Sequence, residues 1–129
     1  MVAIPDEYHD LFERQTFAHV ATMTAEGFPH VTPVWIDYDL EADRLLVNTE
    51  RGRQKERNAR ENPAVGVSMT DPDDPYRYLS VIGEVEELVT EGAREHIDEL
   101  TQRYMDREKY PNPIETERVV MRIRADRVF

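Results

Sequence analysis

The residues with the clearest chemical meaning lie in a basic segment, residues 51–60. Five basic side chains stand here against one acidic side chain, which gives the segment a net charge of +4. The basic residues are Arg51, Arg53, Lys55, Arg57 and Arg60. A strand is expected to end at this point, Gly52 permits a tight turn, and a helix follows. The N–H groups of a helix N-terminus, with arginine and lysine beside them, bind phosphate. The segment therefore indicates a phosphate site, or else a solvated helix whose charges pair with nearby acids.

The rest of the chain is strongly acidic. The 129 residues carry a net charge of −11, so the part outside the basic segment carries −15. Phosphate surfaces repel such a chain as a whole, which argues against a general nucleic-acid or anionic-membrane binder. Lys55 and Lys109 are the only lysines among 16 basic residues. An acidic surface poor in lysine indicates adaptation to a salt-rich cytoplasm, as in a halophilic archaeon, and a GC-rich genome is the alternative explanation.

The sequence lacks the residues or motifs that several classes of chemistry require. The chain has no cysteine, which excludes disulfides, a thiolate nucleophile and Cys-ligated metals. Its four histidines lack the spacing of a metal motif, and no G-x-S-x-G or S-x-x-K motif supports a serine nucleophile. The N-terminus does not resemble a signal peptide, and no apolar run approaches the roughly 20 residues of a membrane helix. We therefore expect a cytoplasmic protein without catalytic or metal-binding side chains.

The hydrophobic periodicity predicts a mostly β chain with peripheral helices. The expected strands are residues 17–24, 28–38, 44–49, 64–70, 76–88 and 119–125. The expected helices are residues 5–15, 53–61 and 90–107. Tight turns between consecutive strands favour antiparallel pairing, and closing the sheet into a small barrel removes its exposed edges. One domain is expected over residues 1–129.

Particular residues refine this expectation. Pro29 and Pro33 cannot donate hydrogen bonds to a neighbouring strand, so the strand over 28–38 is expected at an edge or with a bulge. Thr90 is expected to cap the last helix. Residues 71–75 are expected to form an acidic loop, and residues 108–117 a second loop that contains proline.

Three aromatic residues are candidates for contact with a ligand. Trp35, the only tryptophan, lies in the proline-broken strand and serves either the core or a ligand. Tyr76 and Tyr78 open the fifth strand, where they either stack on a flat ring or close a subunit interface.

Three stretches of the chain form an ordered series. The first is the hairpin sequence Phe17–Met23 followed by Gly27–Trp35. The second runs from Asn48-Thr49 through Arg53-Gln54-Lys55 to Asn62-Pro63, and the third is Tyr78–Val85, in which glycine precedes an acidic residue. Together they resemble the opening hairpin, the cofactor-phosphate segment and a later strand of the pyridoxamine 5′-phosphate oxidase-like superfamily. This superfamily has the FMN-binding split β-barrel fold, and the resemblance covers about residues 8–128.

One branch of the superfamily is the most similar. The short chain and the segment Arg53–Asn58 are most like the deazaflavin (coenzyme F420)-dependent oxidoreductases, and archaea commonly use this coenzyme. The Ser-Arg-Lys phosphate triplet of true pyridoxamine phosphate oxidases is Arg53-Gln54-Lys55 here, and their C-terminal segment rich in Arg and Trp is missing. Vitamin B6 oxidation is therefore not expected.

The resemblance implies a homodimeric antiparallel split β-barrel with coenzyme sites at the subunit interface. It also implies that the coenzyme supplies the hydride chemistry, so that the protein needs no acid, base or nucleophile of its own. In this family pattern the Val34-Trp35 backbone runs along the ring, and Tyr76 and Tyr78 extend to the partner's coenzyme. The residues expected to hold the phosphate and the acidic tail are Thr49, Arg51, Arg53, Gln54 and Lys55.

Four functions remain open at the level of sequence. The first is hydride transfer between bound coenzyme F420 and a small organic substrate that the sequence does not identify. The second is the same fold with FMN, and the third is a non-catalytic module such as a sensor or a haem or flavin carrier. The fourth is a local nucleic-acid binder that uses the basic segment. Absorbance spectra with each coenzyme separate the first two, and turnover of a reducible substrate excludes the third.

Overall fold

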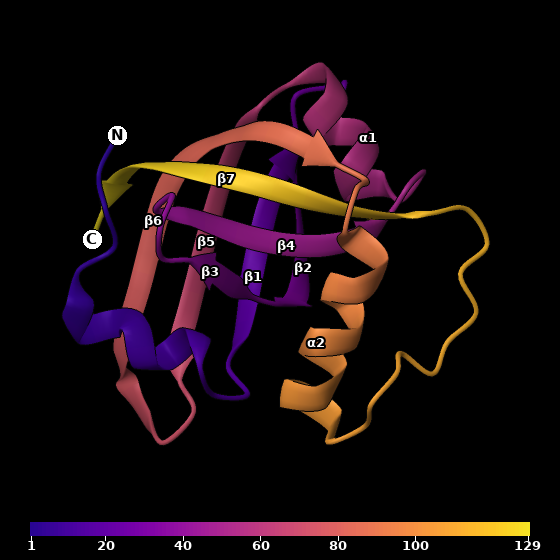
Figure 1. Cartoon of the computed structure of the whole chain (residues 1–129). Helices are drawn as coiled ribbons and strands as arrows, with labels where there is room; N and C mark the ends of the chain where they lie inside the picture. The colour runs from indigo at the N-terminus through magenta and orange to yellow at the C-terminus, as the bar shows by residue number, and fades with distance from the viewer.

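Seven strands and three helices make up the computed structural model, which describes residues 1–129 (Figure 1). The strands are β1 (Phe17–Met23), β2 (Pro29–Trp35), β3 (Asp37–Asp39), β4 (Arg44–Glu50), β5 (Ala64–Asp71), β6 (Asp74–Val89) and β7 (Arg118–Val128). The helices are the 3-10 helix η1 (Asp6–Phe12), α1 (Gln54–Glu61) and α2 (Ala93–Met105). None of the helices has the length and apolar character needed to cross a membrane.

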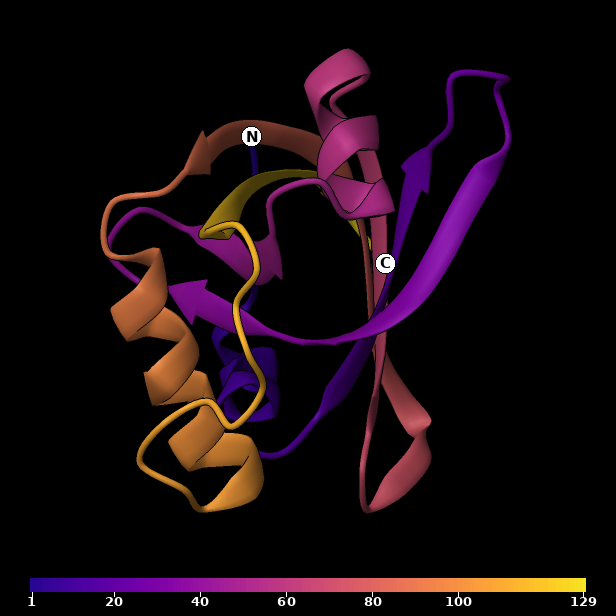
Figure 2. The ribbon, with the colours of Figure 1, turned by 90° about the vertical axis from the view of Figure 1, so that its right-hand side faces the viewer.

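The sheet is curled because its two edge strands follow each other in the chain. Its order is β2-β1-β5-β6-β7-β4-β3, and every neighbouring pair is antiparallel. Only Ile36 separates β2 from β3, so the chain passes from one edge of the sheet to the other within one residue. Figure 2 shows β2 crossing between the two sides of the resulting half-barrel. The expected antiparallel split barrel is confirmed, whereas the homodimer stays a prediction.

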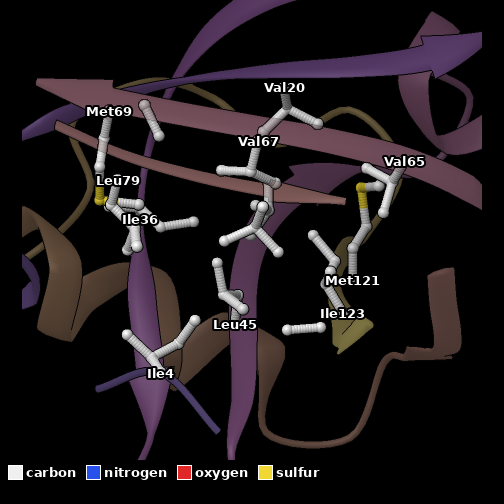
Figure 3. Close-up of a cluster of buried hydrophobic side chains, with 14 of the residues drawn as sticks. Ile4, Val20, Ile36, Leu45, Val65, Val67, Met69, Leu79, Met121 and Ile123 are labelled. Carbon is white, nitrogen blue, oxygen red and sulfur yellow. The ribbon is translucent and has the colours of Figure 1, made fainter. Parts of the chain in front are cut away.

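The core lies inside this curl. Buried and exposed positions alternate along β1, β4 and β5, as period-2 side-chain geometry requires. The inward side chains come from strands on all sides of the half-barrel and meet in one cluster (Figure 3). Its labelled members are Ile4, Val20, Ile36, Leu45, Val65, Val67, Met69, Leu79, Met121 and Ile123. Burial of this apolar surface is the main force that holds the barrel together.

Gly83 lies where β6 approaches the backbone of β7 closely. The pairing of these strands shifts register between Ile82 and Gly83. A Cβ atom on Gly83 would collide with the backbone carbonyl of Arg124. The glycine that precedes an acidic residue in the sequence pattern is therefore required by close packing of two strands.

The second expected strand is divided in the structure. Residues 28–38 form β2 and β3 with the buried Ile36 between them. The expected edge position is confirmed, because β2 and β3 occupy the two ends of the sheet. The break follows from the curl: a single straight strand cannot pair with β1 at one edge and with β4 at the other.

Three other expectations about local structure are corrected in their extent or detail. The loop expected over residues 71–75 is only a short turn at 72–73, because β5 continues to Asp71 and β6 already begins at Asp74. Helix α2 begins at Ala93, after Gly92 with a φ of 77°, and Thr90 does not cap it with its side chain. The helix expected over residues 5–15 is the shorter η1, in which the Tyr8 N–H donates to the carbonyl of Pro5 at 3.0 Å, the three-residue spacing of a 3-10 helix.

Candidate functional site

A pocket of about 360 Å³ opens beside β2, β4, the start of α1 and helix α2. This volume lies in the range that binds small molecules and cofactors. Its lining combines three cations, Arg53, Lys55 and Arg118, with aromatic and aliphatic side chains. The apolar lining residues are Phe17, Pro33, Val34, Trp35, Ile97, Met105 and Tyr110. Such a lining suits a ligand with a flat apolar part and an anionic part.

A tight turn between β4 and α1 places the first two cations. Gly52 has a φ of 96°, in the left-handed region that glycine adopts without strain. The Arg53 N–H donates to the carbonyl of Glu50 at 3.1 Å, and helix α1 begins at the next residue. The turn is closed by Glu56, whose Oε1 accepts from the Gly52 N–H at 2.8 Å. Arg53 and Lys55 therefore project from the first turn of α1 toward the pocket.

The basic segment divides into tied and free cations. Arg60 donates to the carboxylate of Glu56 at 2.6 and 2.7 Å, and Arg51 donates to Glu117 at 2.9 Å. Arg57 donates to the carbonyl of Gly52 at 2.9 Å. The side chains of Arg53 and Lys55 form no ion pair and no hydrogen bond. The basic segment therefore has two kinds of cation. Arg51, Arg57 and Arg60 are bound to partners within the chain, whereas Arg53 and Lys55 have no partner and line the pocket.

Glu56 is the acid that neutralises this segment. Its side chain is fully buried beneath the turn. Burial alone would raise the pKa of its carboxyl, but hydrogen bonds from Arg60 and from the Gly52 N–H hold the pKa below its ordinary value. Glu56 is therefore ionised at neutral pH and stabilises the turn as well as the start of the helix.

Lys55 is a half-buried ammonium without a counter-charge. Burial lowers its pKa, and the nearby guanidinium groups of Arg53 and Arg118 lower it further. A charge held in this way costs free energy, because it has lost part of its hydration and faces two like charges. An anionic ligand in the pocket would offset this cost. The electrostatics of the pocket therefore favour an anion.

Arg118 is a pocket residue that sequence reasoning missed. It lies at the start of β7 and is only 8% exposed. It pairs in register with Glu50 at the start of β7, and its guanidinium lies 5.0 Å from the centre of the Tyr110 ring. The pairing of β4 with β7 is long-range, so no local pattern in the sequence reveals it. Tyr110 and Asn112, from the loop before β7, also line the pocket and were not expected there. Asn48 and Glu50 line it beside the expected Thr49.

Trp35 serves both the core and the pocket. Its ring stacks on Tyr104 of α2, with 5.0 Å between ring centres and 8° between planes, and meets Tyr110 edge-on at 6.4 Å. The Tyr104 hydroxyl in turn accepts from the N–H of Ile36 at 3.1 Å. The indole is therefore held rigidly while its other surface lines the pocket.

The structure brings five of the nine expected site residues to the pocket, namely Val34, Trp35, Thr49, Arg53 and Lys55. Gln54 donates to Asn58 and accepts from Arg57 beside a separate hollow. Arg51 points to Glu117. Tyr76 and Tyr78 are exposed on β6, at 91% and 53%, outside the pocket of their own chain.

No group of three or more His, Asp or Glu side chains converges as metal ligands would.

The fold and the pocket define a class: a split β-barrel with a pocket between β2 and α2 that is lined by cations and aromatic side chains. Residues 4–129 match the family model described as pyridoxamine 5′-phosphate oxidase, and the chain belongs to this family. A comparison with curated proteins finds no match.

Solved structures agree with this assignment. An F420 reductase is 35% identical, covers 98% of each chain and superposes with a TM-score of 0.85. A conserved hypothetical protein from Mycobacterium tuberculosis is 25% identical over 99% of this chain and 84% of that chain, with a TM-score of 0.73. HupZ from Group A Streptococcus is 23% identical over 98% of each chain, with a TM-score of 0.70, and shares the fold. The family and the reductase together support an oxidoreductase fold of the flavin or deazaflavin type.

Proposed function

We propose that this protein is an oxidoreductase that transfers a hydride between bound coenzyme F420 and a small organic substrate. The observation that carries the proposal is the pair of unpartnered cations, Arg53 and Lys55, at a pocket that also presents a rigid aromatic wall. The similarity to an F420 reductase over 98% of each chain supports the choice of coenzyme. An acidic chain retains two free cations at one pocket when its ligand is an anion.

The residues of the pocket suit the proposed coenzyme in three respects. Arg53 and Lys55, with the Thr49 hydroxyl beside them, would hold the phosphate. β2 is an edge strand, so the backbone groups along Val34-Trp35 that point away from β1 have no strand partner and suit the polar edge of a ring. When bound, the coenzyme supplies the hydride chemistry. The protein binds and orients it, and Trp35, Met105 and Tyr110 exclude water from the ring.

We further propose that the protein is a homodimer that uses the solvent-facing side of β2, β1, β5 and β6. One row across these strands runs through Val31, Ala21, Gly66 and Ile82, in register. Val31 and Ile82 are 55% and 48% exposed, and the row has no charged member. Two chains of charge −11 repel each other, so an uncharged surface is where they can meet.

The face of the sheet that carries this row extends to the pocket. Phe17 and Pro33, on the same side of β1 and β2, also line the pocket. A second copy on this surface would therefore cover the pocket mouth, which supports sites at the subunit interface with Tyr76 and Tyr78 near the partner's coenzyme. Light scattering tests this: Ile82→Glu should give a monomer, while Leu40→Glu, an exposed apolar residue in the β3–β4 turn, should stay a dimer. A wild-type monomer would contradict the proposal.

The test of function begins with the coenzyme. The protein should be expressed with both coenzyme F420 and FMN available, and the co-purifying molecule identified by its absorbance spectrum. We expect the deazaflavin, followed by turnover of reducible organic substrates with the reduced coenzyme. Membership of the pyridoxamine 5′-phosphate oxidase family supports FMN as the second candidate. Tighter binding of FMN would replace coenzyme F420 in the proposal, and binding of a coenzyme without turnover of any substrate would indicate a carrier.

A further inference from the structure

Behind the pocket, four side chains from four different elements form a hydrogen-bonded chain. Asp37 of β3 contacts His96 of α2 at 2.9 Å, from Oδ2 to Nε2. His96 Nδ1 lies 3.1 Å from Asn48 Nδ2 of β4. Asn48 Oδ1 accepts from Arg118 Nε of β7 at 2.9 Å. The chain thus begins at the crossover beside Ile36 and ends at a cation of the pocket.

The partners of Asn48 fix where the hydrogens lie. Asn48 Nδ2 also donates to the carbonyl of Ala93 at 2.9 Å, and a carbonyl only accepts. The second hydrogen of this amide nitrogen therefore faces His96 Nδ1, which must accept it. His96 then carries its proton on Nε2 and donates it to Asp37, so the imidazole is neutral. The Asn48 oxygen is left free to accept from Arg118.

The guanidinium of Arg118 is contacted at its Nε edge and on its planar face, but no carboxylate lies close enough to neutralise its charge fully. Its Nε is bound to Asn48, and its guanidinium plane lies over Tyr110. The Glu50 carboxylate is 4.0 Å from its Nη1, at the limit of an ion pair. Its burial lowers its pKa, as in Lys55, although Tyr110 and Glu50 oppose the shift. Its terminal nitrogens are therefore available to a ligand in the pocket.

We propose that Arg118 recognises an anionic group of the ligand, and that Asn48, His96 and Asp37 are positioning residues that fix the orientation of its guanidinium. The inference rests on the proposed coenzyme-binding function. It adds to Arg53 and Lys55 a third cation, from the opposite end of the sequence, whose planar geometry selects a phosphate or carboxylate.

Protonation of His96 should disturb this arrangement. A proton on Nδ1 would face the Asn48 amide nitrogen, so the amide would have to turn, and its oxygen would leave Arg118. The charged groups around His96 are Asp37 of β3, Arg103 of α2, which lies 3.1 Å from Asp37, and Arg118 beyond Asn48 on β7. The hydrogen-bonded chain therefore requires His96 with Nδ1 free of a proton.

The first experiment measures the dissociation constant of coenzyme F420 at pH 8. Arg118→Gln should weaken binding by about 10- to 100-fold, as loss of a charge-assisted contact does. Arg122→Gln is the matched control, because it removes the same charge from the same strand, where Arg122 faces Asp39 and not the pocket. Equal binding by the two variants overturns the inference. If the wild type binds neither coenzyme F420 nor FMN, the proposed function fails and the inference fails with it.

The second experiment separates positioning from a merely structural role. His96→Gln supplies one acceptor and one donor in a single amide, whereas His96→Phe supplies neither. The glutamine variant should retain binding within about 3-fold at pH 8, and the phenylalanine variant should bind about 10-fold more weakly. Rescue by the amide and not by the apolar ring is the result that a merely space-filling role would not give.

A third measurement needs no ligand. Nitrogen NMR of the unliganded protein at pH 8 should show His96 Nδ1 without a proton and Nε2 with one. A protonated Nδ1, or binding by a folded His96→Phe that equals that of the wild type, overturns the positioning role. Thermal unfolding verifies the fold of each variant, and if His96→Phe does not fold, the NMR result decides.

Discussion

Two clusters of charge in this molecule place their cations in opposite arrangements. At the tip of the β5–β6 hairpin, Arg77 binds Asp10 at 2.7 Å and Asp71 at 2.8 Å, and Arg14 binds Asp71 at 3.0 Å. At the pocket, Arg53 and Lys55 have no carboxylate partner. In a chain with 27 acidic and 16 basic residues, a carboxylate is readily available to every cation. Cations that lack one are therefore informative about a ligand, and paired cations are informative about the fold.

The hairpin cluster explains why residues 71–75 form a tight turn. Asp71 Oδ1 accepts from the Asp73 N–H at 2.8 Å, and the Asp71 carboxylate is also bound by Arg14 and Arg77. These contacts lower the pKa of Asp71, with the backbone hydrogen bond as the largest cause. Arg77 also donates to the carbonyl of Glu7, so the cluster fastens η1 to the hairpin. Each exposed pair contributes little alone, and the effect lies in the network.

The largest expected effect is at the pocket. Lys55→Glu replaces a free cation with an anion beside the ligand, and we expect coenzyme binding to weaken by at least about 100-fold. The fold should persist, because the Lys55 side chain has no partner to lose. Lys109→Glu is the control: this exposed lysine does not line the pocket and should bind as the wild type does. Fluorescence titration measures the coenzyme affinity of both variants. Normal binding by Lys55→Glu would show that this unpaired cation does not bind the ligand.

Glu56→Gln tests the paired cations of the basic segment, because it removes the carboxylate that Arg60 and Arg51 face. The change removes the ion pair with Arg60 and weakens the turn at Gly52, so the free energy of unfolding should fall by about 1 to 2 kcal/mol. Urea denaturation measures the loss. Coenzyme affinity should change less than about 3-fold, because Arg60 and Arg51 do not line the pocket. A large gain in affinity would show that freed arginines of the segment also bind the ligand.

The smallest effect is expected at the hairpin and depends on pH. Since the pKa of Asp71 is lower in the folded chain than its ordinary value, the stability it contributes is present at neutral pH and is lost as the pH falls. Asp71→Asn should lower the melting temperature by a few degrees at pH 7 and reduce its further decline in acid. Calorimetry at several pH values checks this. Coenzyme binding at pH 7 should stay unchanged, and a loss of binding would show that the clusters are coupled.

Local patterns predicted most of the barrel. Alternation in residues 17–24 and 64–70 gave strands with one buried face, and Pro29 and Pro33 placed their strand at an edge. The turn is shorter than the expected loop over residues 71–75, and one of the contacts that tighten this hairpin comes from Arg14, far away in the sequence. A sequence pattern carries no record of such long-range contacts.

The site was predictable to the extent that it is local. The turn at Gly52 and the following helix place Arg53 and Lys55, and both follow from neighbouring residues. Which arginines of the basic segment are tied depends on Glu117, and the position of Arg118 depends on the pairing of β7 with β4, which joins residues 70 apart. The divided roles of the basic residues therefore became visible only in three dimensions.

The single-residue crossover at Ile36 has a consequence for how the chain can vary. Trp35, on one side of it, forms the aromatic wall of the pocket, and Asp37, on the other side, begins the hydrogen-bonded chain to Arg118. Because side chains alternate along a strand, an insertion or deletion here would turn one of the two to the opposite face. The segment 106–117 has no such constraint. Length differences among related chains are therefore expected before β7, where they can change substrate preference, and not between β2 and β3.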